Sequence, residues 1–207
     1  MSTEEAITQF VTLFVVIDPA STIAMFLITA RGLTKGQARQ VAISAVAIAF
    51  LVLLFFIVLF QALLEAMHIP LSSFQLAGSI VLLVYGLHLV FDRMKADESF
   101  DINTTEGLVA RSVYPLAIPG LAGPGAMMTV TLLTENYSRS LLQQAQTVGI
   151  VAICMAIIAL IFFAAEPIRR LLGRGGLSTI SRVMGLILSS IAVTNGIVAI
   201  KLVFGLA

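Results

Sequence analysis

The chain has few charged residues, no tryptophan and a single cysteine, Cys154. Charged residues make up 11% of its 207 residues, whereas a soluble domain usually carries about 25%. The hydrophobic share is 59%, and the mean hydropathy is +1.05. One cysteine excludes a disulfide framework, and a net charge of +1 gives no support for a nucleic-acid partner. This composition predicts an integral membrane protein in contact with a lipid bilayer.

The charges are grouped, and long charge-free runs separate the groups. Each run approaches or exceeds the roughly 18 to 20 residues that a helix needs to cross a bilayer. The runs lie between residues 5 and 31 (interrupted by Asp18), 39 and 65, 65 and 92, 111 and 135, 139 and 166, and 182 and 201. We therefore expect an all-α membrane protein with six transmembrane helices.

The basic residues are distributed unequally between the connecting segments. Ten of the twelve Lys and Arg residues fall within residues 31–39, 93–111 and 169–182. Because basic residues in short loops mark the cytoplasmic side of a membrane, this distribution predicts a cytoplasmic polar loop at about residues 92–111 and both termini on the opposite side. The whole chain, residues 1–207, is expected to form one integral membrane domain.

With three spans in each half, the two halves have opposite orientations in the membrane. Pro19 in "IDPASTIAMF" and Pro124 in "LAGPGAMMTV" interrupt the first span of each half, in repeats of about residues 6–91 and 112–204. Inverted repeats with helices broken at matching positions are typical of secondary transporters, whose sites lie near the bilayer midplane. We therefore expect a 3+3 inverted repeat with spans one and four broken near the bilayer centre.

The first break contains a carboxylate, Asp18, directly before Pro19. Asp is a good helix N-cap and Pro a good first helical residue, so Asp18 can be explained as architecture alone. The alternative is a functional role, because a carboxylate at this depth is costly and no Lys or Arg lies inside any of the spans. Such a group must be protonated, hydrated or paired with a mobile cation, which makes Asp18 a candidate proton or monovalent-cation site.

The second break lies in "YPLAIPGLAGPGAMM", which cannot form one continuous helix. Irregular backbone is not tolerated against lipid, so this stretch must line a cavity or pack inside protein. Gly123 before Pro124 predicts a half-helix start without a side-chain cap, where free amides carry the positive end of the helix dipole. The alternative is that the glycines only allow close helix packing.

The two breaks are chemically complementary. A free amino acid could place its ammonium group against Asp18 and its carboxylate against the amides after Gly123. Nearby hydroxyl and amide side chains could contact such a solute or bond to their own helices. The predicted site consists of Asp18, Pro19, Ser21, Thr22, Pro119, Gly120, Gly123, Pro124, Gly125, Thr129 and Asn195. No metal-ligand cluster and no cofactor are expected.

Five segments together carry a family resemblance: "IDPAS", "FLITARGLTKGQAR", "AGSIVLLVYGLHLVF", "YPLAIPGLAGPGAMMTVTLL" and "SRVMGLILSSIAV". Over nearly its whole length, the chain resembles the MarC/SnatA family of six-span bacterial inner-membrane proteins. Where that family typically has Gly-Asn after the first Asp-Pro or Asn-Pro, this chain has Ala20, Ser21 and Thr22. The resemblance implies a multi-pass protein of the bacterial inner membrane, in a group related to amino-acid exporters of which some members transport neutral amino acids. In that membrane, the predicted orientation makes both termini periplasmic.

The favoured function is a secondary transporter of small neutral solutes, with amino acids as the expected class, working by alternating access coupled to protons. The alternative is a passive channel or facilitator for small polar solutes, because two opposed half-helices could also frame a pore. An enzyme is not expected, since hydrolysis by paired carboxylates needs a second acidic residue at depth and no span contains one.

Overall fold

The computed structural model describes residues 2–91, 105–134 and 141–206, and within these ranges it contains helices and no strand. Five helices are long and apolar enough to cross a membrane. They are Thr3–Thr29, counted through a break, Lys35–Val58, Leu71–Phe91, Leu141–Phe163 and Ser178–Phe204. Residues 106–121 and 124–133 form a pair bent by 56°, which gives a sixth crossing if it is one span. The prediction of an all-α membrane protein is confirmed.

The first span is broken where the sequence predicts it. Helix α1 (Thr3–Ile17) ends at Asp18, whose N–H donates to the carbonyl oxygen of Val15 at 3.1 Å. Helix α2 (Pro19–Thr29) begins with the proline, whose fixed φ suits the first helical position. Asp18 itself has a φ of 52°, in the left-handed region that Asp and Asn adopt more readily than other side chains. Asp18 is thus the C-cap of α1 and the N-cap of α2.

Three helices complete the first half. Helix α3 (Lys35–Val58) begins with a reciprocal cap, in which the Gln37 N–H donates to Thr34 Oγ1 at 3.3 Å and the Thr34 N–H donates to Gln37 Oε1 at 2.9 Å. The short helix α4 (Phe60–Ala66) follows it, and α5 (Leu71–Phe91) crosses back.

The fourth span is interrupted by its prolines. Helix α6 (Thr105–Arg111) is followed by the π-helical segment η1 (Ser112–Leu121), which is interrupted at Tyr114 and Ile118. Helix α7 (Pro124–Leu133) comes next. Tyr114 (φ −124°, ψ 131°) and Ile118 (φ −130°, ψ 122°) are extended, because each precedes a proline that disfavours the helical conformation. Residues 105–111, expected in the polar loop, are helical, and residues 92–104 of that loop lie outside the described residues.

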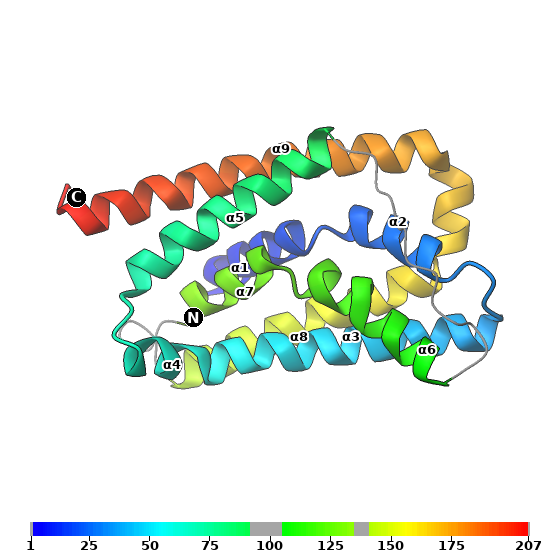
Figure 1. Ribbon diagram of the computed structural model, residues 1–207, viewed down its shortest axis with the longest axis horizontal. Coiled ribbons are helices and arrows are strands. Elements are labelled where there is room, and N and C mark those ends of the chain that lie inside the picture. Colours follow the sequence, from blue (N-terminus) through cyan, green and yellow to red (C-terminus); the bar gives the residue numbers. More distant parts are fainter. Residues whose placement is uncertain (1, 92–104, 135–140, 207) are drawn as a thin grey trace.

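Two long helices complete the second half. Helix α8 (Leu141–Phe163) is continuous, and α9 (Ala165–Phe204) turns sharply at Gly173, whose φ of 65° favours glycine. Helices α5 and α9 lie side by side (Figure 1). Their backbones touch at two glycines: a Cβ at Gly185 would lie 2.7 Å from the carbonyl oxygen of Gly86. Small residues permit this close approach.

The broken helices occupy the middle of the molecule, between the α5–α9 pair and the α3–α8 pair (Figure 1). The packing partners occur in matched sets. If α1 corresponds to η1 and α2 to α7, each contact in one half has a counterpart in the other. The α1–α7 contact matches the α2–η1 contact, and the α2–α9 contact matches the α7–α5 contact. The α1–α8 contact matches the η1–α3 contact. An inverted repeat requires such matching, and the superposition of the two halves stays a prediction.

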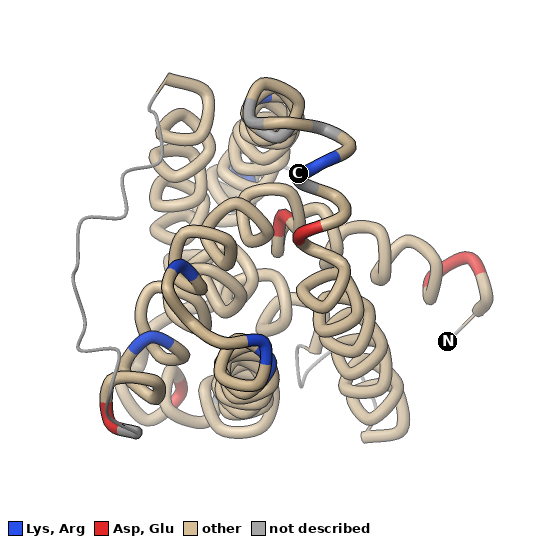
Figure 2. The backbone as a smooth tube through the Cα atoms, turned by 90° about the vertical axis from the view of Figure 1, so that its right-hand side faces the viewer, with Lys and Arg blue, Asp and Glu red and all other residues tan. Residues whose placement is uncertain are grey.

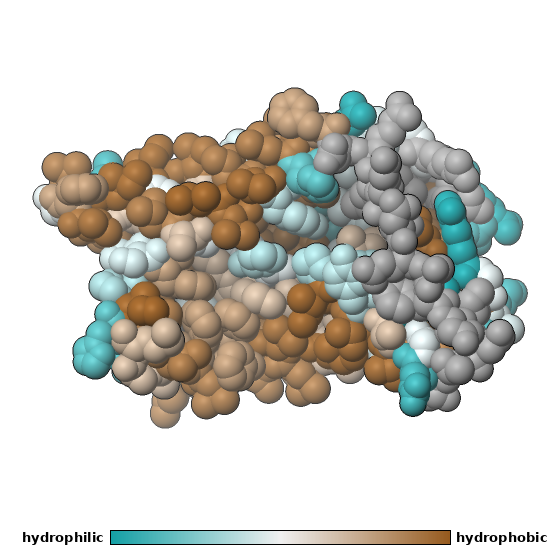
Figure 3. Space-filling view, viewed as in Figure 1, coloured by the Kyte–Doolittle hydropathy of each residue, from teal (hydrophilic) through white to brown (hydrophobic). Residues whose placement is uncertain are grey.

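The two ends of the molecule differ in composition. Both termini lie toward the same end in Figure 1, and Figure 2 looks onto the opposite end, where several Lys and Arg residues gather. Figure 3 shows a mostly apolar surface along the length of the helices, with the hydrophilic residues concentrated near the ends. This pattern is that of a membrane-spanning bundle. Which end faces the cytoplasm stays a prediction.

Candidate functional site

Asp18 is completely buried at the first helix break, with 0% of its surface exposed. Its carboxylate accepts hydrogen bonds from the Ser21 N–H at 3.4 Å, to Oδ1, and from the Ser21 hydroxyl, to Oδ2. Within the described residues, no Lys or Arg forms an ion pair with it. A buried carboxylate with only neutral donors is poorly compensated when ionised. The site therefore favours either a protonated Asp18 or an added cation.

The two hydroxyl residues after the break form hydrogen bonds with the residues of the break itself. Ser21 acts as described above, and the Thr22 hydroxyl donates to the carbonyl oxygens of Asp18 at 3.2 Å and Pro19 at 3.0 Å. Both residues are buried. Thr22 is therefore engaged with its own helix in this conformation, whereas Ser21 bonds directly to the carboxylate.

The second break presents backbone donors without a side-chain cap. Gly123 is the N-cap of α7, with a φ of −78° and a ψ of 168°, and no side chain accepts a hydrogen bond from the first turn. A Cβ at Gly123 would lie 2.6 Å from the carbonyl oxygen of Pro119, so the tight turn requires glycine. The first intrahelical bond comes from the Met127 N–H. The amides of Gly125 and Ala126 thus point out of the helix start, where the dipole is positive.

The two breaks lie next to each other. A Cβ at Gly125, two residues after Gly123, would lie 3.1 Å from Val16 Cγ1, and Val16 is two residues before Asp18. On the other side, a Cβ at Gly120 would lie 3.2 Å from Met25 Sδ. The packing of α1 on α7 and of α2 on η1 therefore brings together the elements that carry the carboxylate and the uncapped amides.

The remaining predicted residues lie at different distances from the breaks. Thr129 is buried on α7, and its hydroxyl forms no hydrogen bond with the described part of the chain. Pro119 and Pro124 are half-buried at the second break. Asn195 is half-buried on α9 next to Gly196, where a Cβ would lie 3.0 Å from Ser79 Oγ on α5. No hydrogen bond within the described residues links Asn195 to either break.

Sequence reasoning missed two polar residues near these elements. Tyr85 on α5 lies within electrostatic range of the Asp18 carboxylate, although in the sequence it is one aromatic among apolar neighbours. Arg111 is buried rather than part of a solvated loop, and its Nη1 donates to the carbonyl oxygens of Thr29 at 2.6 Å and Arg31 at 3.4 Å. Its charge thus lies at the negative C-terminal end of α2.

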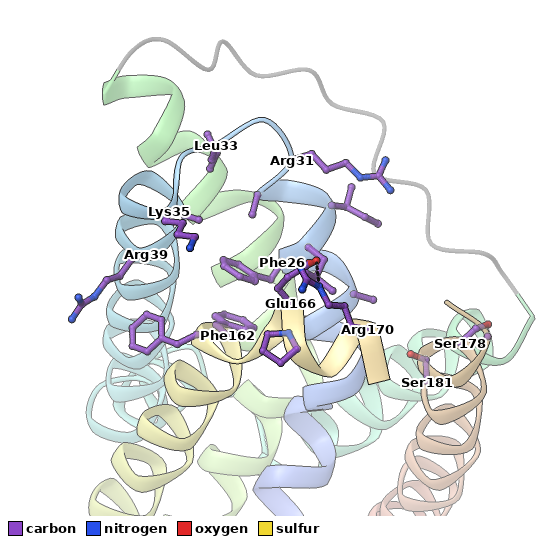
Figure 4. A pocket seen from close by; sticks show the side chains of 18 of the residues that line it. Phe26, Arg31, Leu33, Lys35, Arg39, Phe162, Glu166, Arg170, Ser178 and Ser181 are labelled. Carbon is purple, nitrogen blue, oxygen red and sulfur yellow. Dashed lines mark hydrogen bonds and ion pairs between the residues drawn. The ribbon is translucent and has the colours of Figure 1, made fainter. Parts of the chain in front are cut away.

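A large cavity of about 1750 Å³ opens at the basic end of the molecule, between the ends of α2, α3, α5, α8 and α9 (Figure 4). Asp18 does not line it. Two of its lining residues, Phe26 and Phe162, stack with ring centroids 4.7 Å apart and are buried. Phe26 is eight residues beyond Asp18 on α2, which corresponds to about 12 Å along a helix. The stacked rings form part of the cavity wall on the side of α2 and α8.

Comparisons with known proteins place the chain in a family. The model of the MarC family integral membrane protein matches residues 3–204. The chain is 30% identical to the UPF0056 membrane protein YvbG of Bacillus subtilis over 191 residues, 89% of this chain and 88% of that protein. It is 29% identical over 206 residues to the UPF0056 membrane protein PH0760 of Pyrococcus horikoshii, which covers 98% and 99% of the two chains.

A third relative, the UPF0056 membrane protein of Archaeoglobus fulgidus, is 28% identical over 192 residues, 89% of this chain and 87% of its own length. No solved structure matches the chain. The family model spans residues 3–204 and therefore includes both helix breaks. The chain belongs to the MarC family of integral membrane proteins.

Proposed function

We propose that this protein is a secondary transporter of small neutral solutes, with amino acids as the substrate class, and that it works by alternating access coupled to protons. The observation that carries the proposal is the completely buried carboxylate of Asp18 at a helix break, beside a second break with uncapped amides. Intramembrane carboxylates are costly and are retained mainly where they bind ions or protons.

The two breaks provide opposite charges for a zwitterion. In the proposed binding mode, the ammonium group of the solute takes the place of a fixed cation at Asp18. The carboxylate of the solute accepts hydrogen bonds from the amides at the start of α7, which already carry a positive partial charge. The hydroxyl of Thr129, which forms no hydrogen bond within the described residues, and the phenol of Tyr85 supply further polar contacts. Broken helices hold substrates in this manner in inverted-repeat transporters.

Unequal access at the two ends supports alternating access rather than an open pore. At the basic end, the cavity reaches the Phe26–Phe162 stack. Toward the other end, α1 and α8 are joined by a buried hydrogen bond from the Thr147 hydroxyl to Gln9 Oε1, 3.1 Å long. Leu13 lies between Gln9 and Asp18 on α1 and is completely buried. We infer that this conformation is open toward the basic end, with the carboxylate occluded.

Transport in proteoliposomes tests the function. Purified protein is reconstituted, and uptake of a neutral, an acidic and a basic amino acid is measured with and without a pH gradient, against protein-free liposomes. The proposal predicts that the neutral amino acid is accumulated above its external concentration only when the gradient is present. Equilibration without accumulation would instead identify a passive facilitator, and uptake no faster than in protein-free liposomes would reject transport of these solutes.

A further inference from the structure

The cavity at the basic end has an excess of positive charge on its wall. Four of its lining residues are cationic, namely Arg31, Lys35, Arg39 and Arg170. Glu166 is the acidic residue among those that line it, and it forms an ion pair with Arg170 at 3.2 Å. In the described part of the chain, Arg31, Lys35 and Arg39 form no ion pair. Within the described residues, three of the four cations that line the cavity therefore have no acidic partner.

Two of these cations are neighbours on the same helix face. Lys35 and Arg39 are four residues apart at the start of α3, a spacing at which like charges repel each other. Figure 4 shows both side chains at the start of α3, with the Arg39 side chain directed away from Phe26 and Phe162. The Arg39 guanidinium carbon lies 5.5 Å from the ring centroid of Phe163, a cation–π contact that holds it against the cavity wall. An anion bound by Lys35 and Arg39 would offset their repulsion.

The cavity is large, and the rest of its wall is largely apolar. The apolar part of the wall includes Phe26, Leu27, Leu33, Phe162 and Phe163. Its volume of about 1750 Å³ exceeds the roughly 300–1000 Å³ of most small-molecule sites. A ligand that uses the whole wall needs an anionic group at one end and an apolar body. Anionic lipids have this chemistry, and basic pockets between transmembrane helices are known to receive their headgroups.

We propose that Lys35 and Arg39 bind the phosphate group of an anionic phospholipid whose acyl chain lies against Phe163 and Leu33. The guanidinium and ammonium groups supply charge-assisted hydrogen bonds to the phosphate oxygens. Asp18 does not line this cavity, so the lipid would bind in the vestibule inferred above and not at the carboxylate. Its binding can therefore be measured whether or not the protein transports a solute.

Lipid titration of the purified full-length protein tests the site. Short-chain phosphatidylglycerol, phosphatidylcholine with the same chains, and inorganic phosphate are each added in detergent, with bound lipid followed by native mass spectrometry and protein stability by thermal unfolding. Phosphatidylglycerol is expected to bind and to raise Tm, whereas the other two are not. In the variant Lys35→Gln/Arg39→Gln, its affinity should fall by about tenfold or more, because two charged hydrogen-bonding groups are lost.

The matched control is Arg182→Gln/Lys201→Gln, which removes the same charge from exposed positions outside the cavity. Its affinity should stay within about twofold of the parent, as expected for isolated surface charges. If the double variant Lys35→Gln/Arg39→Gln does not fold, each single Gln variant should weaken binding, and the charge-conserving Lys35→Arg should retain it.

Three results would overturn the proposal. Equal losses in the cavity and control variants would mean unspecific attraction to positive charge. Binding of phosphatidylcholine as tight as that of phosphatidylglycerol would leave no role for the two cations. Displacement of the lipid by inorganic phosphate at similar concentrations would identify a site for the free anion instead.

Discussion

Gly125 lies close to Val16 where the two helix breaks adjoin. A Cβ at position 125 would lie 3.1 Å from Val16 Cγ1, and closer still to Leu82 Cδ1. Val16 lies just before the carboxylate of Asp18, and Gly125 lies in the first turn after the uncapped start of α7. Glycine at this position therefore lets α1 approach α7 closely enough for the two breaks to adjoin.

Gly125→Ala should destabilise the protein by about 1–3 kcal/mol, the usual cost of overpacking a tight core. Thermal unfolding in detergent measures the effect. Gly149→Ala is the matched control, because Gly149 lies inside α8 with nothing within 4 Å of its missing Cβ. The control should be neutral or slightly stabilised, since alanine is the better helix former by about 0.5–1 kcal/mol. Equal effects of both changes would contradict the close packing of α1 and α5 around Gly125.

Truncating the aromatic stack should open a path from the basic cavity to the first break. Ser21→Cys, in a Cys154→Ala background, reports on access because Ser21 is buried beside Asp18. With Phe26→Ala or Phe162→Ala, a water-soluble thiol reagent applied at the basic end should modify position 21 faster than in the parent. Phe163→Ala is the control, since Phe163 also lines the cavity but is 46% exposed. Unchanged reactivity in both stack variants would show that Phe26 and Phe162 do not restrict access.

The orientation in the membrane can be tested with two exposed positions. Gly36, at the basic end, has nothing within 4 Å of its missing Cβ, and Glu4 is exposed near the N-terminus. In cells carrying the Cys154→Ala background, an impermeant thiol reagent should label Glu4→Cys and leave Gly36→Cys unmodified until the membrane is permeabilised. The reverse pattern would place the basic end outside and would invert the predicted topology.

Local residue chemistry made both breaks predictable. Asp18 before Pro19 and Gly123 before Pro124 each combine a residue suited to a helix cap with one suited to a helix start, and both are found at helix starts. The extended residues Tyr114 and Ile118 follow from the prolines after them. Composition and charge spacing were enough to predict the class of fold, because a bilayer requires each spanning helix to have a minimum length and an apolar surface.

The contacts between distant segments could not be predicted in this way. The stack of Phe26 on Phe162 joins α2 to α8, and the hydrogen bond from Arg111 to Thr29 joins the end of α6 to the end of α2. Nothing in the local sequence distinguishes such aromatic residues from lipid-facing ones, or this arginine from a solvated loop residue. Their roles depend on tertiary packing, which a single sequence does not specify residue by residue.

Asp18 is the residue on which the proposed coupling depends. Asn at this position keeps the capping oxygen, tolerates the left-handed φ of 52° and has nearly the same volume, but it cannot ionise. Asp18→Asn should therefore reach the membrane and fold. Asp18→Ala should be less stable as well as inactive, because it removes the acceptor for Ser21 and places alanine at a positive φ.

The most direct test is pH-gradient-driven uptake of a neutral amino acid by Asp18→Asn in proteoliposomes, normalised to the amount of folded protein and compared with counterflow exchange. If Asp18 carries the proton, the parent accumulates the solute, whereas Asp18→Asn loses accumulation and retains at most exchange. If Asp18→Asn accumulates the solute as well as the parent does, Asp18 is a helix cap alone and the proposed proton coupling at this residue is wrong.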